Sequence, residues 1–374
     1  MLDIDVIRTE RDFARLEPEW DALVDAMPRP SPFLGHAWIA AWLRHYGAGR
    51  EISILVARRD GGLVAALPLA TTRSRWLRRL QFVGGGHSAL ADLLQLEGEE
   101  AAGRALIERA RRLPHDVADL YGLPGESRLC RLAGGLQLVE RDEAPVLDLS
   151  APWEALYTAK LPSRARREHR RRRRRLEALG NLDVVVARGS AELPAALEEA
   201  FRLHAMRRAG LPDESGFTTA QGMAFHRDVI VALAAADVAR IVVMRLSGQA
   251  IAFHYSFARA GRLYAHSLGF DPAFARFSPG LLTTFDAIGF AAAEGLTRVE
   301  FLGGAEPYKL ELADRFEPLY QAVGWPASWR GAVAAAGTTR AVAARRRLKE
   351  IPAVHETYVK RLAPARRVLR RLRA

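Results

Sequence analysis

The sequence predicts an α+β (mixed α/β) protein built from two tandem copies of one fold, each a mostly antiparallel mixed sheet flanked by helices. A length of 374 residues suits two domains with separate cores. Two β-rich runs around a glycine turn predict a β-hairpin at 54–68, and the same pattern returns at 240–255. The offset is about half the chain, which favours a repeated fold. Identical residues match at this offset: Gly62 and Gly248, Ala66 and Ala252, Arg59 and Arg245.

The first predicted domain covers residues 1–150. Its first helical segment carries an apolar face at the spacing of an α-helix, formed by Phe13, Leu16, Trp20, Leu23 and Val24. A Gly84–Gly86 break follows the third strand. The predicted elements are a strand at 3–8, helices at 11–26 and 36–46, the hairpin, a strand at 79–83, a helix at 100–112 and short strands toward residue 149.

The second predicted domain covers residues 151–330 and opens with an arginine-rich helix. With a step of about 100° per residue, one side of this helix forms a stripe in which Arg172 is the only arginine, so the helix is predicted to dock by that face. Gly180 is expected to end the helix. The other members of the stripe are Leu161, Ala165, His169, Leu176 and Leu179. The further predicted elements are a strand at 182–187, helices at 191–209 and 219–235, three strands over 240–270, a helix at 279–294, and strands at 298–302 and 317–323.

Residues 331–374 are rich in Ala and Arg at helical spacing and predict a basic helical tail. The net charge of +12 is concentrated in two segments. Residues 160–175 carry ten basic groups against Glu168, and the tail carries twelve against two glutamates, so the remainder is mildly acidic. Such segments can attract tRNA or an anionic membrane surface. The alternative is that both are solvated helix faces in an arginine-biased chain.

Composition excludes several classes of protein. Cys130 is the single cysteine, which excludes an intramolecular disulfide framework and fits a reducing cytoplasm. No secretory signal pattern is visible and no apolar stretch approaches about 20 residues, so no membrane span is predicted. The histidines show no metal-ligand spacing, and Walker, dinucleotide and nucleophile-elbow motifs are absent from the sequence.

A candidate anion site lies at Arg276-Phe-Ser-Pro-Gly-Leu-Leu282. Ser278 suits a helix N-cap, Pro279 suits the first helical position, and Gly280 leaves the backbone accessible. A helix N-terminus offers N–H donors and the positive dipole end to a phosphate or pyrophosphate, and Arg276 would add a second contact. The same tripeptide also begins helices that bind nothing.

Several short motifs point to a known family. The most specific is Gly304-x-Glu306-x-Tyr308-Lys309. The others are Pro32-Phe33…Trp38…Trp42, Gly84…Asp92, Arg170–Leu176, His204…Arg207 and Ser278-Pro-Gly280. Together with the order of strands and helices, they resemble the CelD-like GNAT acyltransferases, a tandem-GNAT family associated with polysaccharide biosynthesis and related to Fem-type aminoacyltransferases. The resemblance covers about residues 10–325.

The resemblance implies that acyl-CoA lies between splayed strands at 263–270 and 298–302, with its pyrophosphate on the helix start. The implied acyl-CoA-binding residues are Arg276, Ser278, Gly280, Leu281 and Leu282. It also implies that Lys309 lies at the acyl carbonyl, where an ammonium would stabilise developing oxyanion charge. Only four of the 55 basic residues are Lys, so a lysine kept here favours a compact ammonium over a guanidinium.

Two departures from the family pattern are visible. Pro279 and Leu281 stand at small-residue positions of the common GNAT loop, and Glu300 stands where the family often has Asp. Glu300 on a buried strand is a candidate catalytic general base, with simple pairing to an arginine as the alternative.

Other polar residues are candidates for substrate binding. His254 and Tyr255 point to opposite faces of their strand, and His266 lies on the next strand; the alternative for each is a structural hydrogen bond. Asp92 and His87 follow the glycine break. The substrate-binding candidates are Tyr308, Glu306, His254, Tyr255, His266 and Asp92. His204 and Arg207 share a helix face, where a structural contact is the favoured interpretation.

These observations predict an acyltransferase that moves an acyl group from acyl-CoA to an amine or hydroxyl of a small molecule or saccharide precursor. Acyl-CoA is the expected co-substrate, with no further cofactor and no metal, and the first domain is expected to shape the acceptor pocket. One alternative is a Fem-type transferase using aminoacyl-tRNA, although neither basic segment interleaves aromatic residues. Another is a non-catalytic module that docks on anionic membrane or RNA. The expected location is cytoplasmic, or peripheral at the inner face of the membrane.

Overall fold

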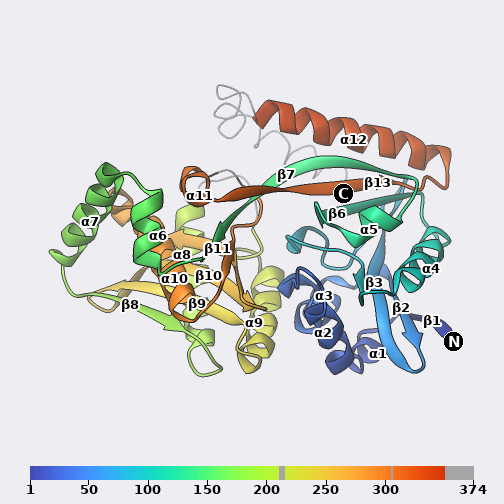
Figure 1. The fold of residues 1–374 in the computed structure, drawn as a ribbon, viewed down its shortest axis with the longest axis horizontal. Coiled ribbons are helices and arrows are strands. Elements are labelled where there is room, and N and C mark those ends of the chain that lie inside the picture. The colour runs from blue at the N-terminus through green and yellow to red at the C-terminus, as the bar shows by residue number, and fades with distance from the viewer. Residues whose placement is uncertain (210–214, 305, 350–374) are drawn as a thin grey trace. The chain divides into compact units, whose positions relative to one another are not determined.

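The computed structural model describes residues 1–209, 215–304 and 306–349 (Figure 1). The chain forms two compact units: unit 1 comprises Met1–Glu143 and Glu317–Ala374, and unit 2 comprises Ala144–Phe316. The chain passes between the units within strand β7 (Leu136–Asp148) and returns within strand β13 (Arg315–Gly324). The sequence analysis placed the domain limits at 150/151 and 330/331 instead.

Unit 1 contains a mostly antiparallel sheet. Its strand order is β1-β2-β3-β4-β6-β13, and the short β5 pairs with β3. The strands β4 and β6 pair in parallel. The further strands are β1 (Leu2–Ile7), β2 (Arg50–Arg59), β3 (Gly62–Arg73), β4 (Arg78–Phe82), β5 (Leu94–Gln95) and β6 (Val117–Pro124). The helices are α1 (Glu10–Ala14), α2 (Glu17–Asp25), η1 (Pro32–Leu34), α3 (His36–Tyr46), η2 (Gly85–His87), α4 (Glu100–Arg111), α5 (Arg128–Leu132) and α12 (Trp329–Lys349).

Unit 2 repeats this pattern. Its strand order is β7-β12-β11-β10-β9-β8, and β11 and β12 form the parallel pair. The further strands are β8 (Leu182–Ala187), β9 (Ala239–Leu246), β10 (Gln249–Arg259), β11 (Arg262–Phe270) and β12 (Arg298–Glu300). The helices are α6 (Trp153–Lys160), α7 (Ser163–Glu177), α8 (Leu193–Arg208), α9 (Ala220–Ala235), η3 (Pro272–Phe277), α10 (Pro279–Ala293) and α11 (Pro307–Leu312). The predicted fold, two copies of a mixed sheet with helices, is confirmed.

The two hairpins turn at equivalent residue pairs. The turns are Asp60-Gly61 and Ser247-Gly248, and all four residues have positive φ, as a tight two-residue hairpin requires. Gly248 therefore corresponds to Gly61 and not to Gly62, so the sequence alignment of the two copies was off by one residue.

The helical periodicity predicted which residues are buried. The apolar face of the first helical segment is inside unit 1, where all five of its members are buried. In α7, Leu176 is fully buried against Met244 and Leu282. Leu179, by contrast, is 52% exposed, because α7 ends at Glu177 and the stripe does not continue beyond it.

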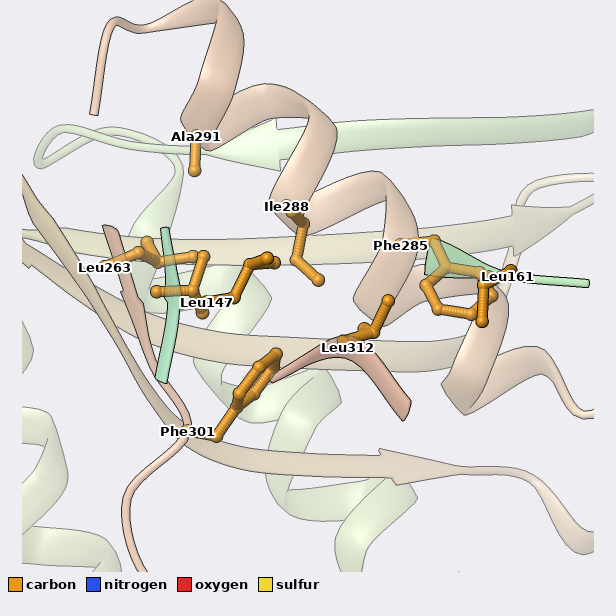
Figure 2. Packing of buried hydrophobic residues seen from close by; sticks show 9 residues of the cluster. Leu147, Leu161, Leu263, Phe285, Ile288, Ala291, Phe301 and Leu312 are labelled. Atoms are coloured by element: carbon orange, nitrogen blue, oxygen red, sulfur yellow. The ribbon is translucent and has the colours of Figure 1, made fainter. Parts of the chain in front are cut away.

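Helix α10 covers one face of the unit 2 sheet. Figure 2 shows Ile288 and Ala291 of α10 close to Leu263 and Leu147 of the strands, with Phe301 completing this part of the core. Helix α8 lies on the other face. Gly269 of β11 lies against His204 of α8, whereas its neighbours Leu268 and Phe270 lie against Gly280 of α10, and successive strand residues point to opposite faces.

The predicted basic tail is helical over the part that the structure describes, since α12 runs to Lys349. Residues 350–374 lie outside the described residues. No helix in the described ranges is both long enough and apolar enough to cross a lipid bilayer.

Candidate active site

The start of α10 has an unusual N-cap. Ser278 adopts a left-handed conformation, with φ 51° and ψ 52°, and its side chain makes no cap hydrogen bond. Its Oγ instead accepts a hydrogen bond of 2.7 Å from Nη1 of Arg172. Pro279 follows as the first helical residue and contributes no N–H. The positive end of α10 thus lies beside a guanidinium group.

Helix α7 brings Arg172 to this position through its docked face. Leu176 anchors the helix in the core, and His169 lies against Phe285 of α10 with ring centroids 5.0 Å apart. Arg173 adds an ion pair of 2.6 Å with Asp286 of α10. The predicted stripe therefore identifies much of the docking surface, including Arg172, and Arg173 reaches α10 from outside the stripe.

The sequence predicted Arg276 as a second phosphate contact and gave no role at this helix start to Arg172, which the structure places there. Arg276 is exposed and stacks on its neighbour Phe277, with the guanidinium carbon 4.7 Å from the ring centroid. The available signal for Arg172 was its presence as the only arginine in an apolar stripe.

The remaining members of the expected acyl-CoA site are packed against the sheet. Leu282 is buried in the core beneath α7, and Leu281 packs partly against the core around α10. Gly280 is buried, and a Cβ there would lie 3.0 Å from the ring of Phe270. A side chain here would press on this ring, so glycine suits the close approach between α10 and β11.

Lys309 is a buried ammonium on α11. Its Nζ lies 2.8 Å from Oε2 of Glu306 and donates to the carbonyl of Gly303 at 3.3 Å. Gly304 permits this arrangement: its φ is +119°, and a Cβ there would lie 2.6 Å from Oε2 of Glu306 and 3.2 Å from Nζ of Lys309. An ammonium has three donors, so these contacts fix its position and use two of them.

His254 lies on the same face of the sheet as Leu268, because the two residues are paired across β10 and β11. Burial lowers the pKa of His254 to about 4, and the positive charge of Lys309 adds to the shift. Its Nδ1 is buried and has no hydrogen-bond partner in the described part of the chain. His254 is therefore neutral at physiological pH and has an unused polar atom.

Arg207 is a second charged group near Glu306 and Tyr308. Arg207 of α8 donates to the carbonyl of Leu268 at 2.9 Å and stacks on Phe270 at 5.2 Å. Burial lowers the pKa of Arg207, and the nearby Tyr308 and Glu306 oppose that shift. Burial also raises the pKa of Tyr308, so its phenol stays protonated at neutral pH. Unit 2 thus brings Lys309, Glu306, Tyr308, His254 and Arg207 into one electrostatically coupled group.

His204, which the sequence placed on the same helix face as Arg207, is a second histidine with buried ring nitrogens. Both of its ring nitrogens are buried without a partner among the described residues. Burial, reinforced by the charges of Arg208 and Arg207, lowers its pKa to about 4.

Glu300 lies apart from this group. Its neighbour Val299 faces α10, so Glu300 points to the opposite face of the sheet. Its carboxylate is completely buried and forms an ion pair of 3.0 Å with Arg262. This is the pairing that the sequence analysis gave as the alternative to a general base.

Tyr255 and His266 belong to an aromatic cluster on the face opposite His254. Tyr255 is completely buried, with ring centroids 4.9 Å from Phe257 and 5.5 Å from His266. Burial strongly raises the pKa of Tyr255. Its hydroxyl has no partner within the described ranges.

Asp92 belongs to unit 1. Its carboxylate accepts hydrogen bonds from Oγ of Ser127 at 2.7 Å and from the backbone N–H groups of Arg128 and Leu129 at 2.8 and 3.0 Å. Burial nevertheless raises its pKa, with these hydrogen bonds opposing the shift. The carboxylate fixes the start of α5, which accounts for its burial without a ligand.

No cluster of His, Cys, Asp or Glu in the described ranges is arranged to hold a metal ion. The chemical features of unit 2 are therefore an anion-accepting helix start with Arg172 and a buried ammonium beside a neutral imidazole. The first suits a phosphate-bearing substrate, and the second suits a reaction that develops negative charge on oxygen.

Comparison with known proteins agrees with this description. Residues 163–310 match the family model described as "Acetyltransferase (GNAT) domain". The match extends from the first turn of α7 to just beyond Lys309. A search of curated protein sequences gave no significant match.

Solved structures share the fold at low sequence identity. FemX is 11% identical with a TM-score of 0.58, over 85% of this chain and 96% of that chain. The C-terminal domain of an Agrobacterium fabrum protein described as a lysylphosphatidylglycerol synthetase is 16% identical with a TM-score of 0.57, over 87% of this chain and 96% of that chain. A Bacteroides thetaiotaomicron VPI-5482 protein described as of unknown function is 13% identical with a TM-score of 0.54, over 87% of this chain and 100% of that chain. These likenesses show a shared fold, and residues 163–310 are similar to the GNAT acetyltransferase family model.

Proposed function

We propose that unit 2 transfers an acyl group from a CoA thioester to an amine or hydroxyl acceptor. The observation that supports this most is the start of α10 within the GNAT domain, where a helix N-terminus without a side-chain cap lies beside Arg172. Backbone N–H groups, the helix dipole and a guanidinium together suit the pyrophosphate of CoA.

The proposed reaction is a direct acyl transfer. The lone pair of the acceptor attacks the thioester carbonyl carbon, and the carbonyl π electrons move onto oxygen. The intermediate then collapses, the C–S bond breaks, and the CoA thiolate takes up the proton that the acceptor loses. Negative charge on the carbonyl oxygen is greatest midway, so a donor placed there accelerates the chemical step.

Lys309 is the proposed donor to that oxygen. Glu306 and the Gly303 carbonyl hold its ammonium in place, and the site is buried, which strengthens its interaction with a developing oxyanion. His254 is proposed to contact the substrate through its unused Nδ1. Glu300 is proposed to hold the strand pair through Arg262 and to take no part in proton transfer.

The resemblance to CelD-like enzymes favours a saccharide precursor or another small molecule as the acceptor. A second candidate function is transfer from aminoacyl-tRNA, as in Fem-type enzymes. The exposed arginines of α7 favour it, because a polyanionic donor would find a basic surface on the helix that supplies Arg172. These residues are Arg164, Arg167, Arg170, Arg171, Arg174 and Arg175.

Thermal unfolding of the full chain with CoA, acetyl-CoA, a long-chain acyl-CoA or tRNA distinguishes these donors. Binding to the native state raises the melting temperature by mass action. We expect a rise with CoA compounds. Arg172→Ala should weaken CoA binding by about 10- to 100-fold, the usual effect of losing a hydrogen bond to a charged group.

Arg175→Ala is the matched control, because this arginine is exposed on the same helix. It should bind CoA like the wild type. Stabilisation by tRNA with no response to any CoA compound would replace the CoA assignment by the aminoacyl-tRNA one.

A further inference from the structure

Unit 1 contains a cavity at the point where its two parallel strands separate. The strands β4 and β6 pair at Arg79 with Val117 and at Leu80 with Ala118, and the pairing then ends. A cavity of about 270 Å³ lies beyond that point, lined by residues 81–82 of β4 and by Asp119 and Tyr121 of β6. In sheets with parallel strands, ligands commonly bind where neighbouring strands part.

A second cavity of about 120 Å³ adjoins the first. Both are lined by Gln81, Phe82, Gly85 and Gly86, so the η2 loop separates two halves of one site, which we call the wedge pocket. Together the halves fall within the lower part of the usual range for ligand pockets, roughly 300–1,000 Å³. A Cβ on Gly85 or Gly86 would meet no atom within 4 Å, so the loop borders open space.

Two guanidinium groups lie in the walls of the wedge pocket. Arg141 stacks on Tyr121 at 4.3 Å and donates to Oε1 of Gln321 at 3.0 Å. Arg50 stacks on Trp42 at 5.3 Å in the smaller half. Stacking on an aromatic face holds a guanidinium in a fixed plane, which prepares it to bind a carboxylate or phosphate through two parallel hydrogen bonds.

The acidic group of the wedge pocket is already neutralised. Asp119 receives Nη1 of Arg79 at 3.1 Å and the side-chain amide of Gln321. Burial lowers the pKa of His87, and the charge of Arg50 adds to the shift, so this imidazole is neutral at physiological pH. Nε of Arg141 also lies 3.8 Å from a carboxylate oxygen of Asp142, so the positive charge of the walls comes mainly from Arg50, and it favours an anionic ligand.

The wedge pocket also offers hydrogen-bonding groups for a neutral polar ligand. Gln81 accepts from the hydroxyl of Thr72 at 3.2 Å, which leaves its amide N–H groups available to the cavity. Trp42 is buried, and its indole N–H has no acceptor among the residues that the structure describes. A buried polar group without a partner is costly, and a ligand oxygen would remove that cost.

The start of helix α4 in unit 1 does not suit a diphosphate. This crossover helix begins after Glu99 and carries Glu100 in its first turn, with no side-chain cap. Acidic groups at a helix start repel phosphate from the positive end of the dipole. The wedge pocket therefore suits a small ligand with a single anionic group better than it suits CoA.

We propose that the wedge pocket of unit 1 binds a small polyhydroxylated molecule that carries one carboxylate or phosphate. The anion pairs with Arg141 or Arg50, and the hydroxyl groups meet Gln81, Gln321 and the exposed backbone of Gly85 and Gly86. This binding is independent of the acyl-donor site in unit 2.

Calorimetric titration of the full chain tests the proposal with glucuronate, glucose 6-phosphate, glucose and inorganic phosphate as probes. Glucuronate or glucose 6-phosphate should bind at least about tenfold more tightly than glucose, because a charge-assisted hydrogen bond contributes about 1.5–3 kcal/mol. Whichever of the two binds more tightly identifies the anion as carboxylate or phosphate. Failure of both to bind, or equal binding of glucose, would overturn the proposal. Equal binding of inorganic phosphate and glucose 6-phosphate would overturn the part that concerns hydroxyl groups.

Two variants locate the binding. Gly86→Ala fills part of the wedge pocket without a clash and should weaken the tighter probe about tenfold or more at an unchanged melting temperature. Gly134→Ala is the matched control, since a Cβ there also meets no atom within 4 Å and this residue does not line the pocket. Arg141→Lys keeps the charge but loses the planar fork, and should also weaken binding. Wild-type affinity in both Gly86→Ala and Arg141→Lys would place the ligand elsewhere. A parallel CoA titration reports on unit 2 separately.

Discussion

The contacts of Lys309 explain why a lysine stands at this position in a chain that otherwise uses arginine. The ammonium fits between the carboxylate of Glu306 and the carbonyl of Gly303, close to Gly304. A guanidinium is larger and planar, and it would displace at least one of these partners. The rarity of lysine in the sequence was therefore a useful signal of a geometrically restricted site.

If Lys309 stabilises the acyl oxyanion, Lys309→Ala should lower turnover by about 10²- to 10³-fold, the usual effect of losing one such donor. The affinity for the acyl donor should change little, because the interaction strengthens mainly in the transition state. Lys309→Arg should also lose activity. Steady-state kinetics with CoA titrations measure both effects.

Lys160→Arg is the control for the Lys309 variants. Lys160 also pairs with a carboxylate, Asp314 at 2.6 Å, but it lies outside the proposed active site. It should tolerate the exchange. Full activity in Lys309→Arg at an unchanged melting temperature would remove Lys309 from the catalytic group.

His254 should make the stability of unit 2 dependent on pH. Its pKa is about 4 in the folded protein, below the ordinary value of 6.5. The unfolded chain therefore binds a proton first as the pH falls, and the free energy of unfolding decreases between about pH 6.5 and 4. The shift corresponds to a loss on the order of 3 kcal/mol.

Chemical denaturation at a series of pH values measures this loss. The difference in the free energy of unfolding between the wild type and His254→Gln should decrease as the pH falls across that window. The similar contribution of His204 is present in both proteins and therefore cancels in this difference. Parallel curves for the two proteins would show that His254 does not titrate in this way.

Sequence reasoning about single residues succeeded where a motif was short and local. The Ser278-Pro279-Gly280 pattern predicted the start of α10, and alternation predicted that His254 and Tyr255 point to opposite faces. It missed Arg172, because the partner of that residue lies more than a hundred positions away in the chain. Pairing of Glu300 with an arginine was predicted only as an alternative, because the local pattern does not show that Arg262 of the neighbouring strand meets this carboxylate.

At the scale of elements, periodicity predicted most helices and strands, since each buried face leaves a regular pattern in the sequence. The arginine-rich segment shows this well. Its composition alone would suit a disordered tail, yet the spacing of His169 and Leu176 predicted a docked helix. The structure shows that this face packs against α10, a partner that the sequence did not predict. A few apolar residues at the correct spacing were sufficient to identify the buried face of a highly charged helix.

The elements that sequence analysis placed least well are those that connect the units. The strands β7 and β13 each cross a unit limit, so each strand has one part in unit 1 and the other part in unit 2. Local patterns contain no information about which sheet a strand joins, because that depends on contacts distant in sequence. The domain limits expected at 150 and 330 therefore divide the chain into consecutive segments. The units are defined by spatial contacts, and unit 1 combines two separate segments of the chain.

At the scale of the whole molecule, the two units share a strand pattern but differ where a ligand would bind. Both contain a parallel pair that separates, β4 with β6 and β11 with β12. Unit 2 follows its first parallel strand with Ser278 and Arg172 at a helix start, whereas unit 1 has the η2 loop and an acidic α4 start. Duplication of the fold thus leaves the proposed donor site in one unit and the wedge pocket in the other.

The tail contributes both to the packing of unit 1 and to the positive charge of the chain, and truncation can separate these two contributions. Removing residues 340–374 takes away basic groups and also part of α12 that packs within unit 1. Val342 is 5% exposed, and Arg346 pairs with Glu140 at 2.5 Å. Deletion of 350–374 should therefore keep the wild-type melting temperature, whereas deletion of 340–374 should lower it.

Both truncations remove the basic residues beyond position 349, so both should weaken binding to tRNA and to anionic vesicles, most clearly at low salt. Thermal unfolding and vesicle or tRNA pull-downs on the same samples separate the two effects. Equal melting temperatures for the two truncations would show that the last turns of α12 contribute nothing to unit 1. If the variant that lacks residues 350–374 binds tRNA and vesicles as well as the full chain does, anion binding would be assigned to the exposed arginines of α7. These arginines form the other concentrated positive charge on the chain.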